Sequence, residues 1–135
     1  MKNRIVLILS VMVLFTVCSC VKDNTDQYVG IYTGTLTTID FVKEDVQLTF
    51  TNHSNKKTLS IFDIELEKIS DNQFNANIEV ILEIIHLVDT GITADILSNA
   101  SATFAFENDE VTMDMKYNFF KSVEEPFYVR YIGKK

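Results

Sequence analysis

Few side chains in this sequence have the chemistry of a catalyst or a metal ligand. The imidazoles are His53 and His86, and neither belongs to a His-x-His or Glu-x-x-His motif. His53 lies in a polar stretch typical of a solvated turn, whereas His86 lies in an apolar run typical of a buried histidine with a backbone partner. There is no Gly-x-Ser-x-Gly elbow and no phosphate-binding loop. The sequence predicts no catalytic residue, no metal site and no cofactor, so we expect a protein that is not an enzyme.

The two thiols, Cys18 and Cys20, both lie near the start of the chain. An exported domain stabilised by disulfides would distribute its cysteines through its body, and this chain does not. The thiols follow a basic pair, Lys2 and Arg4, and an apolar run over residues 5–17. That run is shorter than the roughly 20 residues that span a bilayer as a helix. The pattern predicts an export signal peptide, with an uncleaved membrane anchor as the alternative.

The stretch Val17-Cys18-Ser19-Cys20 resembles the lipobox of bacterial lipoproteins. In that family the signal peptidase cuts before the last cysteine, whose sulfur carries a diacylglycerol with fatty acyl chains such as palmitate. The resemblance implies that residues 1–19 are a signal peptide and that Cys20 is the lipid attachment site. Two or three acyl chains, worth about 0.8 kcal/mol per buried methylene, would hold the protein on a lipid bilayer without spanning it. We expect residues 20–27 to form a flexible tether.

Length and charge limit the classes of protein to which this chain can belong. The chain has 135 residues, which predicts a single domain. Its formal charge is −7, and removal of residues 1–19 leaves 10 basic and 19 acidic residues and a charge of −9. A surface this acidic repels phosphate backbones, so nucleic acid is excluded as a partner.

From Tyr28 onward, apolar and polar residues alternate with a period of two, which predicts half-buried strands. Asn- and Asp-rich stretches at residues 52–57, 70–73 and 108–110 predict the turns between strands. We expect a filled interior, with inward side chains that include Phe50, Phe62, Phe74, Phe104, Phe106, Met113 and Met115.

Two stretches fit the alternation less well. In the run over residues 78–88 the apolar phase slips at Ile84 and Ile85, which predicts a strand with a bulge or bend near residues 83–86. The alternative is a strand that is buried on both faces there. Residues 93–100 are the one helix candidate, with an irregular strand as the alternative.

Both ends of the domain resemble a known family. Gly30, Tyr32, Gly34 and Leu36 at one end, and Tyr131-Ile-Gly-Lys-Lys135 at the other, resemble the calycin-like β-barrel domains of Bacteroidales lipoproteins. The resemblance implies a barrel related in shape to lipocalins and no known activity. We therefore predict an all-β domain over residues 28–135, a small antiparallel up-and-down β-barrel, with a two-sheet β-sandwich as the alternative. Gly30 and Gly34 flank Tyr32 on one strand face, where they predict a structural role: either the Tyr32 ring lies along the strand, or a neighbouring strand crosses closely.

The aromatic residues are the remaining resource for recognition. In the pairs Phe119-Phe120 and Phe127-Tyr128, one member must point outward or line an opening. Aromatic side chains at a barrel mouth hold sugars or apolar ligands, so we predict ligand contacts at Tyr32, Phe120 and Tyr128. The sequence thus favours a non-catalytic envelope lipoprotein of the outer membrane, on its periplasmic face or at the cell surface, that binds a small apolar molecule or a glycan. The alternative is a structural or interaction module that docks on another envelope protein.

Overall fold

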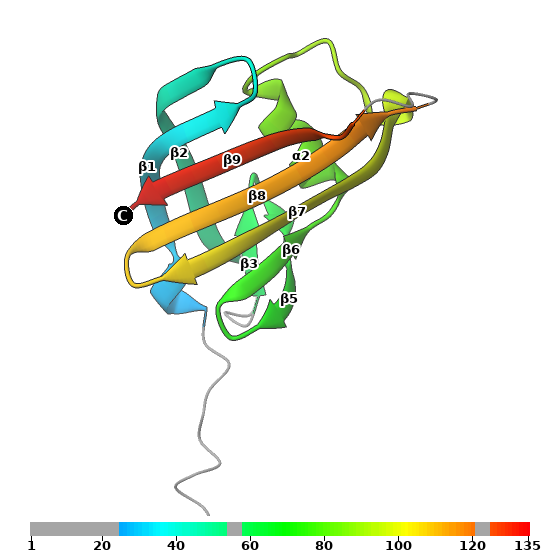
Figure 1. Cartoon of the computed structure of the whole chain (residues 1–135). Helices are drawn as coiled ribbons and strands as arrows, with labels where there is room; N and C mark the ends of the chain where they lie inside the picture. The colour runs from blue at the N-terminus through cyan, green and yellow to red at the C-terminus, as the bar shows by residue number, and fades with distance from the viewer. Residues whose placement is uncertain (1–24, 54–57, 121–124) are drawn as a thin grey trace, which may run out of the picture.

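The fold is a single antiparallel sheet rolled into a nearly closed barrel (Figure 1). The computed structural model describes residues 25–53, 58–120 and 125–135. The predicted signal peptide, Cys20 and most of the predicted tether lie outside these residues. The strands are β1 (Gly30–Thr38), β2 (Val42–His53), β3 (Thr58–Ile61), β4 (Ile64–Glu65), β5 (Glu67–Ser70), β6 (Gln73–Ala76), β7 (Leu97–Glu107), β8 (Glu110–Phe119) and β9 (Phe127–Lys134). Three short helical segments accompany them: η1 (Asp26–Tyr28), α2 (Ile78–His86) and η2 (Ala94–Ile96).

The sheet order is β4-β3-β2-β1-β9-β8-β7-β6-β5. Apart from β4 and β5, the two ends of the sheet, strands that follow one another in the chain are antiparallel neighbours, and β9 returns to pair with β1. The seam lies between β4 and β5, where the amide of Leu66 donates to the carbonyl of Leu59 at 2.8 Å. The predicted small all-β barrel is confirmed, and the described strands form one sheet in place of the two sheets of a sandwich.

Apolar and polar residues alternate along the long strands, and the apolar side chains fill the interior of the barrel. Phe50, Phe74, Phe104, Phe106, Met113 and Met115 of the predicted inward set are all buried. Phe106 contacts four rings, with centroid distances of 4.7 Å to Tyr28, 5.1 Å to Phe50, 5.7 Å to Tyr32 and 5.8 Å to Phe74. The core of the barrel is thus a packed aromatic cluster.

The prediction for Phe62 is wrong. Phe62 and Asp63 have positive φ values of 54° and 61° and form the two-residue turn that joins Ile61 to its partner Ile64. Such tight hairpin turns need left-handed backbone at both central residues. Phe62 therefore leaves the core and lines a hollow on the outer face of β2 together with Gln47, Thr49 and Thr51.

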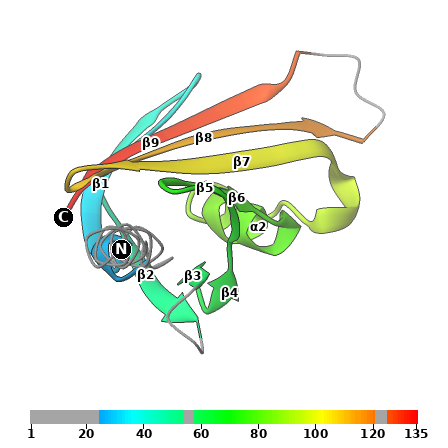
Figure 2. The same ribbon diagram turned by 90° about the horizontal axis from the view of Figure 1, so that it is seen from below.

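The strand predicted beyond Ala76 is also wrong, because residues 78–86 form the helix α2. The Asn77 side chain accepts a hydrogen bond from the amide of Val80 at 3.0 Å, as a helix N-cap does. Val80, Ile81, Ile84 and Ile85 are buried, a spacing that places one face of the helix on β6 and β7 (Figure 2). What looked like a slip in a two-residue period is the start of a 3.6-residue period.

Residues 93–100 combine both predicted alternatives. The turn η2 covers Ala94–Ile96, and β7 then begins at Leu97 with a register shift between Ser98 and Ser101. The turns predicted at 70–73 and 108–110 join β5 to β6 and β7 to β8. Part of the turn predicted at 52–57 lies outside the described residues.

The β1–β9 pair closes the barrel through two glycines. Gly34 pairs with Gly133, and a Cβ on Gly34 would lie 2.0 Å from the carbonyl oxygen of Ile132. The Tyr131 ring covers Gly133, and its hydroxyl lies 2.8 Å from the carbonyl oxygen of Tyr32 and 3.0 Å from that of Val46. Burial raises the pKa of Tyr131 to about 12. The structural role predicted for Gly34 is confirmed as a close approach of two strands.

The end of the barrel next to the first described residues is sealed by η1. Tyr28 is buried against Phe106 and Phe74, and its hydroxyl donates to the carbonyl of Asp71 at 2.7 Å. Thr25 is buried as well and donates to the Asn52 side chain at 2.7 Å. Among the described residues, no helix is long and apolar enough to cross a membrane.

Candidate functional site

The side chains with catalytic or metal-binding chemistry do not form a cluster. His86 is half-buried at the end of α2, and its Nε2 donates to the carbonyl of Ile92 at 2.7 Å, the backbone partner that the sequence predicted. His53 is the last residue of β2. Within residues 25–53, 58–120 and 125–135, no three His, Cys, Asp or Glu side chains are grouped so that they could hold a metal ion.

The structure separates the three predicted ligand-binding residues. Tyr32 has no exposed surface and belongs to the core, where its ring meets Phe50 at 5.5 Å. Phe120 and Tyr128 are the outward members of their pairs, as expected, with 63% and 62% of their surface exposed. Tyr128 lines two hollows at one end of the barrel, whereas Phe120 lies outside both.

The first hollow, here called the mouth pocket, opens at the end of the barrel opposite η1. Its volume is about 370 Å³. Its lining comes from the β1–β2 turn, the segment after α2 and the adjoining ends of β8 and β9, namely Thr38, Ile39, Asp40, Phe41, Val88, Asp89, Ile92, Tyr117, Phe119, Phe127, Tyr128 and Val129. A volume near 300 Å³ or above is typical of a small-molecule site.

The β1–β2 turn is held by its own side chains. Thr38 Oγ1 accepts hydrogen bonds from the amides of Asp40 at 3.3 Å and Phe41 at 3.2 Å, which sets the turn without a glycine. Lys43 Nζ donates to the carbonyl of Leu87 at 2.9 Å and so ties this hairpin to the end of α2. The first hairpin therefore forms although it lacks a glycine in its turn.

The segment after α2 forms the opposite wall. Asp89 Oδ1 accepts from the amide of Gly91 at 2.9 Å, and the His86–Ile92 bond holds the chain beyond it. Ile92 is buried under this loop. These bonds present the Asp89 carboxylate to the pocket.

Three rings from β8 and β9 form an aromatic cluster on the third side. Tyr117 and Phe127 are stacked, with centroids 5.4 Å apart and planes 16° apart. Phe119 meets Tyr117 at 5.8 Å and Phe127 at 5.1 Å in edge-on contacts. Burial, and next the Asp89 charge, raise the pKa of the Tyr117 hydroxyl. The carboxylate and the aromatic cluster therefore face the same space.

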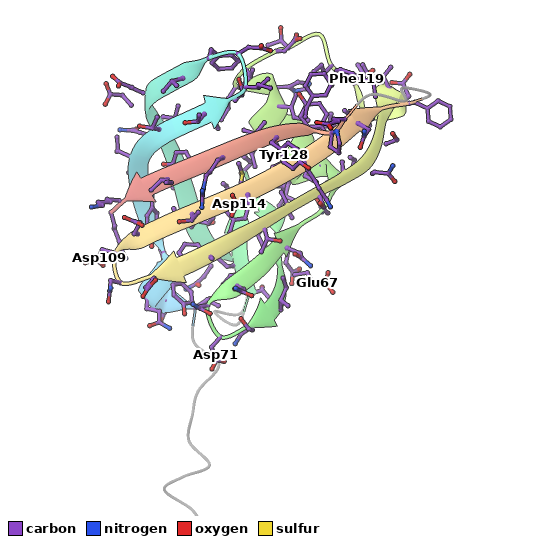
Figure 3. All side chains as sticks on the ribbon, viewed as in Figure 1. Glu67, Asp71, Asp109, Asp114, Phe119 and Tyr128 are labelled. Carbon is purple, nitrogen blue, oxygen red and sulfur yellow. The ribbon has the colours of Figure 1, made fainter. Side chains whose placement is uncertain are left out.

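The second hollow, the outer groove, lies outside the sheet across β9. It has a volume of about 550 Å³ and shares Thr38, Ile39, Tyr128 and Val129 with the mouth pocket. Arg130 and Asp114 line it and form an exposed ion pair at 3.3 Å. Figure 3 shows Tyr128 and Phe119 away from Asp109, which lies at the sealed end. Tyr128 thus lies where the two hollows meet.

Sequence reasoning identified one lining residue and missed others. Phe119 and Phe127 belong to the aromatic pairs that it singled out, but their half-buried members line the pocket together with the exposed Tyr128. Asp40 and Asp89 carry no sequence signal for this role, because each lies in an ordinary polar turn. Only the folded chain brings them to one opening.

Comparison with known proteins adds no relative. No protein-family model, no curated protein and no solved structure matches this chain.

Proposed function

We propose that this chain is a cell-envelope lipoprotein, anchored through acylated Cys20, whose barrel is a non-catalytic binding module for a small apolar molecule or a glycan. The observation that carries the binding function is the mouth pocket. It joins a wall of aromatic rings to hydrogen-bonding groups on Thr38, Asp40 and Asp89. Ligand sites combine these features, with apolar walls that supply contact area and a few polar groups that orient the ligand.

The position of the pocket agrees with attachment at the N-terminal end. η1 and the tip of the β1–β2 hairpin lie at opposite ends of the barrel (Figure 1). They are joined by β1, whose nine residues span about 30 Å at roughly 3.3 Å per residue. A chain tethered through Cys20 would therefore hold its sealed end towards the bilayer and its mouth pocket towards the aqueous phase.

Binding is tested on the chain purified from membranes in a non-ionic detergent. Native mass spectrometry should detect a small molecule that co-purifies with the wild type and is lost from Tyr128→Ala. Phe120→Ala is the matched control, because it removes an equally exposed aromatic ring that lines neither hollow. Retention of the molecule by Tyr128→Ala, or its loss from both variants, would contradict a site at the mouth.

Anchoring is tested separately by metabolic labelling with a tagged fatty acid. We expect the wild type and Cys18→Ser to be labelled and Cys20→Ser to be unlabelled, because the lipobox pattern places the acyl chains on the last cysteine. Labelling of Cys20→Ser would overturn the lipid attachment site.

Exposed apolar side chains at the hairpin tip favour a second candidate, an interaction module that docks on another envelope protein. Ile39 is 86% exposed, and Val42 on the same hairpin is also exposed. A photo-crosslinking residue at position 39 should then capture a partner in cells, whereas one at Ile31, exposed near the sealed end, should not. Equal capture at both positions would argue against this candidate.

A further inference from the structure

The described lining of the mouth pocket combines aromatic rings with carboxylates. Five of its lining residues are aromatic, two are aspartates, and none of the lining residues described is Lys, Arg or His. We propose that its ligand is a small organic cation, an ammonium group carried on an apolar skeleton. This inference rests on the proposed binding function and names the class of ligand.

The aromatic cluster supplies the surface that such a cation prefers. The face of an aromatic ring carries partial negative charge, and an ammonium group within about 6 Å of the centroid is attracted to it. The near-parallel rings of Tyr117 and Phe127 lie beside the edge-on Phe119, so the pocket is lined by rings in more than one orientation. Several rings around one ammonium group form the arrangement that recognises methylated amines.

The carboxylates supply the countercharge. Asp40 and Asp89 lie on opposite walls, on the β1–β2 turn and after α2. Asp89 is held by the Gly91 amide through Oδ1. Neither aspartate is in an ion pair with a described residue, whereas Asp114 in the outer groove is paired with Arg130. A cation in the mouth pocket would complete this electrostatic arrangement.

Two cations on strands that border the pocket, Lys43 on β2 and Arg130 on β9, are engaged elsewhere. Lys43 donates to the Leu87 carbonyl, and Arg130 pairs with Asp114 on the outer face of the sheet. The chain as a whole is acidic, with a net charge of −7. A concave site lined by one sign of charge concentrates ligands of the opposite sign, so anions are disfavoured here.

A neutral ligand fits these residues less well. Covering a carboxylate with apolar surface removes its water without a replacement partner, which costs free energy. An ammonium group removes the same water and supplies the missing charge. The pocket should therefore discriminate between a cation and a neutral molecule of the same shape.

The experiment compares choline with its neutral carbon isostere, 3,3-dimethylbutan-1-ol, by NMR titration of the full chain in a non-ionic detergent. We expect choline to shift the signals of Tyr117, Phe119 and Phe127 and to bind at least about tenfold more tightly than the isostere. Asp89→Asn and Asp40→Asn should each weaken choline binding about fivefold or more. Asp109→Asn removes one charge at the sealed end (Figure 3) and should leave choline binding unchanged.

The outcomes separate this inference from the proposed function. If the isostere binds at the mouth as tightly as choline, or if both asparagine variants bind choline normally, the ligand is not a cation, while a binding site at the mouth stands. If neither probe binds at the mouth, the cation inference is also overturned, and the mass-spectrometry comparison of Tyr128→Ala with Phe120→Ala decides the binding function independently. Unchanged thermal melting of the asparagine variants shows that lost binding is not lost folding.

Discussion

The two ends of this barrel use aromatic clusters for opposite purposes. At the sealed end, Tyr28 on η1 stacks on Phe106 at 4.7 Å and closes the core. At the mouth, Tyr117, Phe119 and Phe127 form a smaller cluster of three rings that borders a pocket of about 370 Å³. Ring contacts alone therefore do not distinguish a core from a binding site. The difference is whether another segment of the chain covers the rings.

Whether the chain itself covers an aromatic ring decides whether burial of that ring stabilises the fold or is left for a ligand. Rings that the chain itself buries contribute to folding, at about 1.5–3 kcal/mol for each fully buried large apolar side chain. At the mouth Tyr117 is buried, but Phe119 and Phe127 are only half-buried and keep apolar surface that a ligand can remove from water. Mutations at the sealed end should therefore mainly lower the stability of the fold, whereas mutations at the mouth should mainly weaken ligand binding.

The largest expected effect is at the sealed end. Phe106→Ala should lower the free energy of unfolding by about 3–5 kcal/mol, because it removes a ring in contact with four others and leaves a cavity. Phe119→Ala should cost less than about 2 kcal/mol, since Phe119 is only half-buried. Urea unfolding monitored by circular dichroism measures both. Equal losses of unfolding free energy would show that the mouth cluster stabilises the fold as much as the sealed-end cluster does.

A smaller effect is expected where β1 and β9 close the barrel between the two ends. Gly34→Ala should cost about 1–3 kcal/mol, because the new Cβ meets backbone atoms of Ile132 and Gly133 that cannot move without separating the strands. Gly91→Ala, beside the mouth pocket, brings a Cβ 3.3 Å from a side-chain oxygen of Asp89. Its melting temperature should stay close to that of the wild type. A similar drop in both would mean that the loop is packed as tightly as the barrel.

The Tyr131 hydroxyl gives a pH-dependent test of the closed part of the barrel. Its pKa is about 12 in the folded chain against 10.0 unfolded. The neutral form is thus favoured by folding, so this stabilisation is complete below pH 10 and is lost as the pH rises from 10 to 12. Tyr131→Phe should be less stable by about 1 kcal/mol at pH 8 through its lost hydrogen bonds. Its unfolding free energy should then fall less steeply than that of the wild type above pH 10. Parallel curves for the two proteins would contradict this assignment.

The smallest contrast is between two tyrosine hydroxyls. Tyr28→Phe removes the bond to the Asp71 carbonyl and should cost up to about 1 kcal/mol. Tyr128→Phe acts on a side chain that is largely exposed at the mouth and should change stability by less than about 0.5 kcal/mol. Chemical denaturation of the two variants in parallel checks the difference. A larger cost for Tyr128→Phe would place the mouth tyrosine in the stabilised core.

The sequence by itself determined the long strands, since every second side chain of β8, from Val111 to Tyr117, must be buried and the polar ones between them must not. Asn77 and the residues after it show where this reasoning ends. Their apolar positions satisfy a two-residue and a 3.6-residue period equally for one turn, and contact with β6 and β7 selects the helix. The Phe62–Asp63 turn was hidden for a related reason, because it has positive φ values without glycine or asparagine.

The sequence also determined that one member of each aromatic pair faces outward, because neighbouring residues on a strand point to opposite sides. Only the tertiary structure decided which rings line an opening and which carboxylates join them. Asp40, Asp89 and Phe127 come from three distant segments, and their meeting depends on the closure of β1 on β9 and on the position of α2. The apolar pattern of a segment predicts which of its own side chains are buried. A binding site depends on which distant segments the fold brings to the same opening.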